Sequence, residues 1–191
     1  MSSGAAPPPN SLLPAGASYC QCQFLQWGYW GGDISSANPS GAATPRIDRG
    51  GINFWVAGQP TLSTDINTLV ANPVVVTYTG HVIGSVFNNG AQYVAAGGLS
   101  GTYTFATQMG SFLVSNYDGQ SFTIKGKLPT NASGTQYTAT ISTTTNQKLP
   151  ITGTFNGSFY GALAAETGGN FNFHTTVGPT YLTSGIFAAK R

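Results

Sequence analysis

Apolar and polar residues alternate along most of the second half of the chain. Between Leu99 and Phe105 every second residue is apolar or glycine, and the residues between them are Ser and Thr. The same period recurs downstream, for example from Ile151 to Phe159. A period of two sends alternate side chains to opposite faces of a strand. These segments therefore predict β-strands with one face in a core and the other in water.

About eight such strands are predicted, and they are joined mostly by short turns such as Asn88-Asn89-Gly90 and Asp118-Gly119. The predicted strands are 74–87, 98–107, 110–117, 119–128, 136–143, 150–160, 169–175 and 181–189. Eight strands is the number at which a closed barrel is filled by its own side chains, and closure removes exposed sheet edges. We therefore expect an all-β fold, an antiparallel up-and-down barrel of about eight strands.

Glycines in the apolar phase support a barrel, because a missing side chain relieves crowding inside a strongly curved sheet. They are Gly101, Gly126, Gly153, Gly157 and Gly185. The alternative is a barrel in lipid with a polar interior. The interleaved glycines and the lack of aromatic girdles argue against that alternative.

The chain changes character near residue 70. We expect a Pro/Gly-rich extended tail at 1–22, an aromatic-rich irregular arm with short strands at 23–72, and the barrel domain at 73–191. A short strand is predicted around 52–57, and 64–69 predicts one helical turn, with Asp65 in a cap position. No helix long enough to matter is expected.

Five aromatic residues of the arm are candidate interface anchors, because large aromatics dominate protein interfaces. They are Trp27, Tyr29, Trp30, Phe54 and Trp55. The alternative is that they only cover the mouth or the outer wall of the barrel.

The composition excludes some classes of function. Only 6% of the residues are charged. The chain has 7 Lys and Arg and 5 Asp and Glu, and the basic residues form no run. The electrostatic footprint of phosphate binding is missing, so nucleic acid is not expected as a partner. The longest apolar stretch, Pro73 to Val76, is far shorter than a membrane-spanning helix.

Few residues could carry catalysis or hold a metal. The acids are Asp33, Asp48, Asp65, Asp118 and Glu166. Asp118 falls in a turn, and we expect the Glu166 carboxylate to accept bonds from backbone amides rather than to bind a partner. His81 and His174 fall in the polar phase of their strands, and no nucleophile motif accompanies them. We therefore expect no catalytic residue, no metal site and no cofactor.

The two cysteines, Cys20 and Cys22, are separated by one residue. In an extended strand they would point to one face about 7 Å apart, so an intrachain disulfide would be strained. We expect free thiols or an inter-subunit bridge, with a strained intrachain bond as the alternative. A metal site at Cys-x-Cys would need further ligands, and His81 and His174 are the only histidines in the sequence.

The C-terminal third carries a recognisable pattern. A Phe159-Tyr160-Gly161 strand end is followed by a turn with Glu166, Gly168-Gly169 and Phe171, and the pattern closes with Gly185-Ile186-Phe187-Ala188-Ala189-Lys190-Arg191. This pattern resembles the C-terminal barrel of the transferrin-binding protein B-like family of bacterial surface proteins. The resemblance implies a β-barrel and a role in the capture of nutrients or host factors. From the residues themselves we expect a helical turn at Ala162 to Glu166 that the two glycines break.

Two non-enzymatic functions follow. In the first, the chain is a bacterial cell-surface or secreted module that binds a protein or ligand partner, as the resemblance implies. In the second, it is a structural subunit that self-assembles through its N-terminal arm into a filament, layer or oligomer, because a nearly neutral surface has little self-repulsion.

Overall fold

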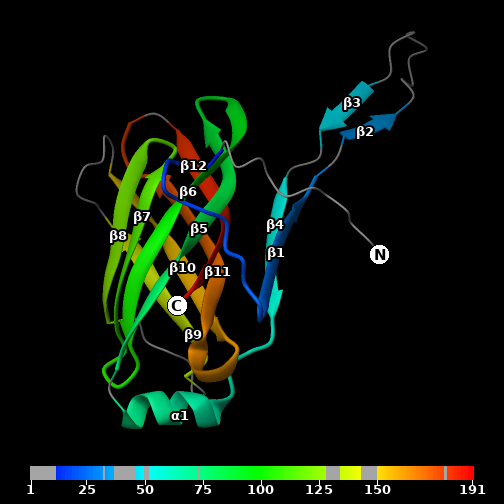
Figure 1. The fold of residues 1–191 in the computed structure, drawn as a ribbon. Coiled ribbons are helices and arrows are strands. Elements are labelled where there is room, and N and C mark those ends of the chain that lie inside the picture. Colours follow the sequence, from blue (N-terminus) through cyan, green and yellow to red (C-terminus); the bar gives the residue numbers. More distant parts are fainter. Residues whose placement is uncertain are drawn as a thin grey trace.

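The computed structural model describes residues 12–31, 33–36, 46–49, 52–72, 74–127, 134–142, 150–178 and 180–191. Eight of the strands in this part form one sheet (Figure 1). They are β5 (Val75–Asn88), β6 (Ala91–Thr104), β7 (Met109–Tyr117), β8 (Gln120–Lys127), β9 (Gln136–Ser142), β10 (Ile151–Tyr160), β11 (Glu166–Thr175) and β12 (Tyr181–Lys190). They match the eight predicted strands closely. The main difference is β6, which begins at Ala91 because a two-residue turn at Asn89-Gly90 lets the ladder start at once.

The sheet is antiparallel and up-and-down and curls into a barrel, as expected, but the ladders of the described residues do not close it fully as the sequence had suggested. Its order is β8-β7-β6-β5-β12-β11-β10-β9, so the first strand, β5, pairs with the last, β12. The two ends of the sheet, β8 and β9, come close to each other, but no backbone ladder joins them in the described residues. The barrel is therefore closed between β5 and β12 and has an unpaired seam between β8 and β9.

The apolar phase of the strands fills the interior. Stacked aromatic rings form much of this core, among them Tyr78, Tyr103, Phe112, Tyr137, Phe155, Phe159 and Phe187. Buried tyrosine hydroxyls find partners within the wall, such as Thr183 for Tyr117 at 2.6 Å. Burial raises the pKa of Tyr103 to about 12. Gly157 leaves room for the ring of Tyr137, as the expected relief of crowding requires.

A nine-residue helix, α1 (Ser63–Ala71), covers one end of the barrel and buries Ile66 and Leu69 in the core. The expectation that no helix would matter was wrong, because two apolar residues three apart are too short a pattern to stand out. Asp65 is not the cap. That position belongs to Leu62, and Asp65 Oδ2 accepts a bond of 3.1 Å from the amide of Leu163. In the described residues no helix is long and apolar enough to span a membrane.

A second, two-stranded sheet lies along the outside of the barrel (Figure 1). It pairs β1 (Leu25–Trp30) with β4 (Asn53–Gly58), close to the strand predicted at 52–57, and we call these two strands the handle. A further pair, β2 (Asp33–Ser36) and β3 (Arg46–Arg49), extends beyond the handle and away from the barrel.

Part of the outer wall is covered by the handle and by residues 12–24. His81, Ile83, Ile186 and Ala188 belong to the outward phase of β5 and β12, yet all four are buried. The expectation that the outward phase meets water is wrong for this patch. Elsewhere on the wall the outward residues are exposed or partly exposed, for example along β10 and β11.

Candidate functional site

The handle has two faces, because alternate residues of its strands point to opposite sides. The inner face, toward the barrel, carries Leu25, Trp27, Tyr29, Phe54 and Val56. The outer face carries Gln26, Gly28, Trp30, Asn53, Trp55 and Ala57. The five candidate interface aromatics are thus divided. Trp27, Tyr29 and Phe54 are partly buried, whereas Trp30 and Trp55 are exposed.

The inner face packs on the outer wall of the barrel. Trp27, Phe54 and Val56 contact a cluster that includes Ile83 and Ile186 of adjacent strands. Gly168 of β11 makes this contact possible, because a Cβ atom there would lie 3.1 Å from both Leu25 Cδ2 and Val56 Cγ2. The handle is therefore attached to the barrel by an apolar contact of its own.

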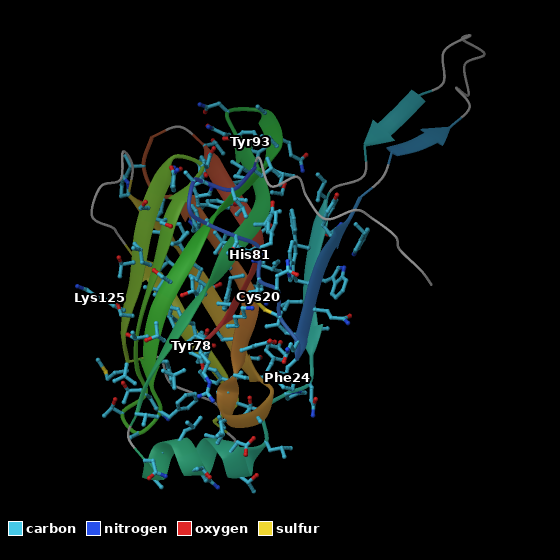
Figure 2. The ribbon with its side chains drawn as sticks, viewed as in Figure 1. Cys20, Phe24, Tyr78, His81, Tyr93 and Lys125 are labelled. Carbon is cyan, nitrogen blue, oxygen red and sulfur yellow. A yellow bond between two sulfur atoms is a disulfide. The ribbon has the colours of Figure 1, made fainter. Side chains whose placement is uncertain are left out.

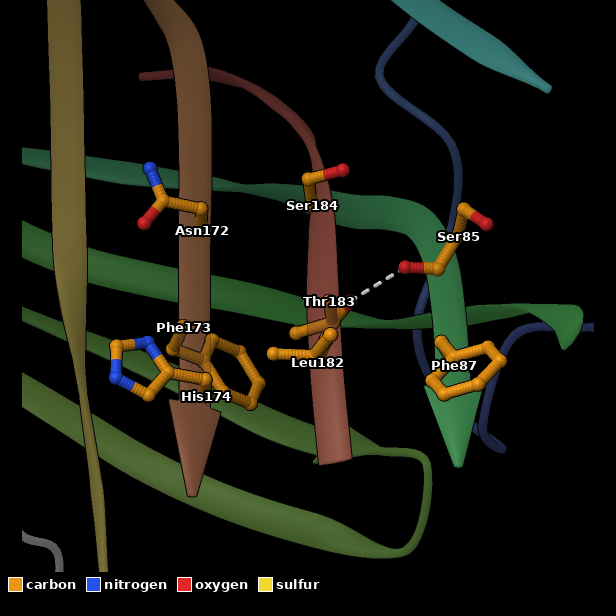
Figure 3. Close-up of a pocket in the computed structure, with 8 residues that line it drawn as sticks. All are labelled: Ser85, Phe87, Asn172, Phe173, His174, Leu182, Thr183 and Ser184. Atoms are coloured by element: carbon orange, nitrogen blue, oxygen red, sulfur yellow. Dashed lines mark hydrogen bonds between the residues drawn. The ribbon is translucent and has the colours of Figure 1, made fainter. Parts of the chain in front are cut away.

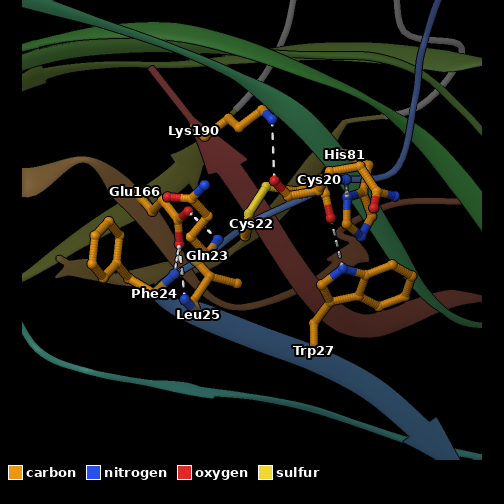
Figure 4. Close-up of a disulfide and its surroundings, with 10 residues drawn as sticks. Cys20, Cys22, Gln23, Phe24, Leu25, Trp27, His81, Glu166 and Lys190 are labelled. Atoms are coloured by element: carbon orange, nitrogen blue, oxygen red, sulfur yellow. Dashed lines mark hydrogen bonds between the residues drawn. A yellow bond between two sulfur atoms is a disulfide. The ribbon is translucent and has the colours of Figure 1, made fainter.

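Glu166 fastens the start of the handle to the barrel (Figure 4). Its carboxylate accepts bonds from three successive backbone amides, those of Gln23 at 2.5 Å, Phe24 at 2.9 Å and Leu25 at 2.8 Å. Bonds between amides and an ionised carboxylate are among the stronger hydrogen bonds in proteins. The expectation that this carboxylate binds backbone amides is confirmed, and the amides belong to the arm.

His81 holds the segment before the handle. Its Nδ1 accepts a bond of 3.0 Å from the amide of Cys20, and its ring lies 4.3 Å from that of Trp27 and 5.0 Å from that of Tyr19. Burial lowers the pKa of His81 to about 3, so the ring is neutral at physiological pH. In Figure 2, Cys20, His81 and Phe24 lie where the barrel and the handle meet.

Cys20 and Cys22 form a disulfide with each other, with their Cα atoms 5.2 Å apart. The alternative, an intrachain bond, is what the structure shows, and the expectation of free or inter-subunit thiols was wrong. The segment is not an extended strand here, and the backbone brings the two residues together. Lys190 at the end of β12 donates a bond of 3.1 Å to the carbonyl of Gln21, between the cysteines. The disulfide loop is thus joined to the last strand of the barrel.

The outer face of the handle is open. Trp30 is 59% exposed and Trp55 is 37% exposed. The Trp55 indole lies over Gly28, where a Cβ atom would come within 2.8 Å of the ring. A shallow groove of about 260 Å³ adjoins it, lined by Cys20, Gln21, Cys22, Leu25, Gln26, Trp27 and Trp55. The lining takes Gln26 and Trp55 from the outer face and Leu25 and Trp27 from the inner face, so the groove lies at the edge of the handle beside the disulfide loop.

A second concave surface lies on the outer wall of the barrel (Figure 3). Its volume is about 270 Å³, and it is lined by Ser85, Phe87, Asn172, Phe173, His174, Leu182, Thr183 and Ser184. Phe87 and Leu182 are cross-strand neighbours and both are exposed. His174 is exposed, as expected from its place in the polar phase. No grouping of three metal-ligating side chains occurs here or elsewhere in the described residues.

Tyrosines and an aspartate close the barrel end opposite α1. Asp118 Oδ2 accepts bonds from the hydroxyls of Tyr93 at 2.8 Å and Tyr181 at 2.9 Å. Burial raises the pKa of Tyr181 above its ordinary value, and the neighbouring Asp118 charge raises it further. Asp118 has a φ of 52° in the turn between β7 and β8, as predicted. The carboxylate is occupied by these phenols and stabilises the mouth.

The residues of the recognised pattern have structural roles. Phe159 and Phe171 point into the core, and Gly161, with a φ of 73°, turns the chain out of β10 against the ring of Phe24. The side chain of Tyr160 packs on the outer wall, beside the handle. Gly168 and Gly169 do not break a helical turn, as had been expected, because they lie within β11. The turn itself is the short 3-10 element η2 (Ala162–Ala164).

The sequence did not reveal the anchors at His81 and Lys190, and it offered the intrachain disulfide only as the alternative. The hydrogen bonds of His81 and Lys190 join residues more than 60 positions apart, and the disulfide depends on a local bend of the backbone. Contacts of these kinds leave no periodic signal in the sequence. The one available signal was His81 itself, a titratable residue within an otherwise apolar and small run of β5.

No protein-family model matches the chain, and a comparison with curated proteins finds no match. Solved structures do match. Transferrin binding protein B (TbpB) from serogroup B Neisseria meningitidis is 19% identical with a TM-score of 0.61 over 90% of this chain and 32% of that one. A TbpB variant from Haemophilus parasuis is 17% identical with a TM-score of 0.60 over 89% and 33%.

Intact Ap-TbpB, with its N and C lobes, is 16% identical with a TM-score of 0.53 over 90% of this chain and 35% of that one. The chain thus spans about a third of the length of the TbpB structures it matches. At such identities the likeness establishes the fold alone. The chain has a TbpB-like β-barrel fold, as the pattern in its C-terminal third implied.

Proposed function

We propose that the chain is a non-catalytic protein-binding module of the bacterial cell surface or exterior, and that the outer face of the handle is its contact surface. The observation that carries this proposal is the exposure of Trp30 and Trp55 on a sheet whose other face is fixed to the barrel. Large aromatics held on a rigid support supply contact area at a low cost in conformational entropy.

The arrangement of the acids supports a binding role over a catalytic one. Asp65, Asp118 and Glu166 each accept hydrogen bonds from other parts of the chain. These carboxylates hold the helix, the mouth and the handle in place. In the proposed module, the barrel at 73–191 is the scaffold and the arm at 23–72 is the element that meets the partner.

The fold suggests the class of partner. The matching structures are named for transferrin binding, and vaccine antigens are among them. By analogy with that name, we propose a host protein as the partner of this chain. The analogy concerns the fold, and the partner surface is argued from Trp30 and Trp55 alone.

The proposal is tested by capture from host serum. The chain is immobilised, serum and purified transferrin are passed over it, and a stoichiometric partner is expected. Replacing both exposed tryptophans (Trp30→Ser with Trp55→Ser) is expected to weaken binding at least about tenfold. Phe87→Ser is the matched control, because Phe87 is 40% exposed on the barrel wall, and it should bind like the wild type.

Two results would overturn the proposal. A partner that binds the double variant as tightly as the wild type would place the contact elsewhere. If no serum protein binds the immobilised chain, the capture of host serum proteins is not its function.

A further inference from the structure

We infer that the Cys20–Cys22 disulfide is a redox-active site, which opens and closes by exchange with small thiols such as glutathione while the chain stays folded. The inference goes beyond the proposed function, because it assigns a covalent chemistry to the disulfide loop and needs no protein partner. Three observations carry it: the unequal exposure of the two cysteines, the separate anchoring of the backbone on both sides of them, and a cation at the loop.

The two cysteines differ in their access to solvent. Cys20 is buried, with 7% of its surface exposed, whereas Cys22 is partly exposed. Both residues line the groove of about 260 Å³ at the edge of the handle. Exposed disulfides are the ones that exchange readily with thiols, whereas buried ones are inert. A small thiol therefore reaches this bond from the side of Cys22.

The disulfide is not needed to hold its own segment in place (Figure 4). A loop of three residues removes little entropy from the unfolded chain, so it contributes little stability. On one side of the bond, the amide of Cys20 is bound to Nδ1 of His81. On the other side, the three amides that follow Cys22 are bound to the Glu166 carboxylate. The bond can open without detaching the segment, so the disulfide and dithiol forms are both expected to be folded.

A lysine at the loop favours the thiolate form of the cysteines. Lys190 Nζ donates a bond of 3.1 Å to the carbonyl of Gln21, the residue between the two cysteines. A nearby cation stabilises a thiolate, which is the species that attacks and leaves in disulfide exchange. The Glu166 carboxylate opposes this effect, but its two oxygens already accept three amide bonds that partly compensate its charge. Lys190 therefore supports the exchange through its charge.

The exchange proceeds in two steps. The thiolate of a small thiol attacks Sγ of Cys22 and forms a new S–S bond there, while the Cys20–Cys22 bond breaks and leaves its electron pair on Sγ of Cys20. A second small thiolate attacks the sulfur of the first, so that Cys22 is released and the two small thiols leave as their disulfide. The two protons that the small thiols lose are those that Cys20 and Cys22 gain through water. Two electrons thus pass to the protein, and the reverse steps restore the bond with Cys20 as the attacking residue.

The first experiment equilibrates the wild-type chain in glutathione buffers of graded ratio. Alkylation after an acid quench, followed by mass spectrometry, counts the disulfide, mixed-disulfide and dithiol forms. We expect a reversible two-electron titration with the β-sheet circular dichroism retained, and a shift in tryptophan fluorescence because Trp27 and Trp55 line the groove. Reduction should be at least about tenfold faster than global unfolding. A bond that is reduced only as fast as the chain unfolds would overturn the inference.

The second experiment compares the two single-cysteine variants. Cys20→Ser keeps the partly exposed Cys22, and Cys22→Ser keeps the buried Cys20. With glutathione disulfide as the probe, the native Cys20→Ser variant should form the mixed disulfide at least about tenfold faster than the native Cys22→Ser variant. In urea the two rates should be similar, since the difference arises from burial. Equal rates in the native state would show that Cys22 is not the attacked sulfur.

The third experiment tests Lys190 in the Cys20→Ser variant. Lys190→Gln keeps a donor for the Gln21 carbonyl but removes the charge, so the pH profile of mixed-disulfide formation should shift to higher pH. Lys125→Gln is the matched control, because Lys125 is an exposed lysine of β8, away from the loop in Figure 2. A profile that Lys190→Gln leaves in place would overturn the role of Lys190. None of these measurements involves a serum protein, so this inference and the proposed function can fail separately.

Discussion

The amide of Cys20 donates a hydrogen bond of 3.0 Å to Nδ1 of His81, across 61 positions of the chain. The acceptor nitrogen must be unprotonated, so the contact requires the neutral ring. His81 is fully buried between the arm and the barrel wall, and its Nε2 has no hydrogen-bond partner among the described residues. The attachment of the arm is therefore linked to the protonation state of one histidine.

We expect His81 to make the chain less stable in acid. Its pKa of about 3 in the folded state lies below the ordinary value of 6.5, so between these values the unfolded chain binds a proton that the folded chain does not. The free energy of unfolding should fall as pH drops from 6.5 toward 3, by up to about 1.4 kcal/mol per pH unit. Urea unfolding at several pH values measures this slope.

The variant His81→Gln retains an acceptor for the Cys20 amide but does not titrate, so its slope should be smaller than that of the wild type over the same range. His174→Gln is the control, because it makes the same substitution at an exposed position of β11. Equal slopes for the wild type and His81→Gln would contradict the assignment.

Replacing Glu166 by Gln should loosen the start of the handle. The two carboxylate oxygens accept three amides, and in Gln one oxygen becomes an NH₂ group that opposes a donor. We expect a loss of about 1–3 kcal/mol. Hydrogen exchange should be faster at Gln23, Phe24 and Leu25 and unchanged in the core of the barrel. Unchanged protection of these three amides would show that the carboxylate does not hold the handle.

A side chain at Gly168 should displace the handle and spare the barrel. The Cβ atom of Gly168→Val would meet Leu25 and Val56 of the handle at 3.1 Å, and the larger side chain would clash with them. It would also meet the carbonyl oxygen of Phe187 in β12 at 3.0 Å, which is a tight contact that a small shift relieves. We expect red-shifted tryptophan fluorescence with the β-sheet circular dichroism retained. At Gly169, a Cβ atom would instead meet the backbone of Asn156 within the sheet, so Gly169→Val should unfold the barrel itself. Equal damage from both substitutions would contradict the two roles.

The disulfide should add little stability. Its loop holds only three residues, for which the loss of chain entropy amounts to about 1.6 kcal/mol. Replacing Cys20 and Cys22 by Ser should therefore lower the free energy of unfolding by no more than about 2 kcal/mol, since Glu166 and His81 still hold the neighbouring amides. Thiol titration of the wild-type chain should find no free cysteine before reduction. A free thiol in the native chain would contradict the pairing.

The barrel could be predicted from the sequence because the signals that specify its strands and turns lie close together along the chain. Alternation from Leu99 to Phe105 and from Ile151 to Phe159 assigns the inward residues, and two-residue turns at Asn89-Gly90 and Asp118-Gly119 fix neighbouring strands. In such a meander, sequence neighbours are also neighbours in space.

The arm could not be predicted in the same way. Trp27 and Trp30 are both large aromatics in one short run, and only the pairing of β1 with β4 decides that one packs on the barrel while the other is exposed. His81 looked like a surface residue because its strand alternates, and its burial depends on a segment 60 residues earlier. Contacts of this kind are set by tertiary packing and leave no periodic trace.

The pairing of β5 with β12 gives this fold a particular order of events during synthesis. Strand β5 finds its second neighbour only when β12 (Tyr181–Lys190) has been synthesised. Until then β5 offers a free edge, and ladders with so large a sequence separation form slowly. The ladder between β5 and β12, which joins the two ends of this meander, is therefore expected to form late in folding.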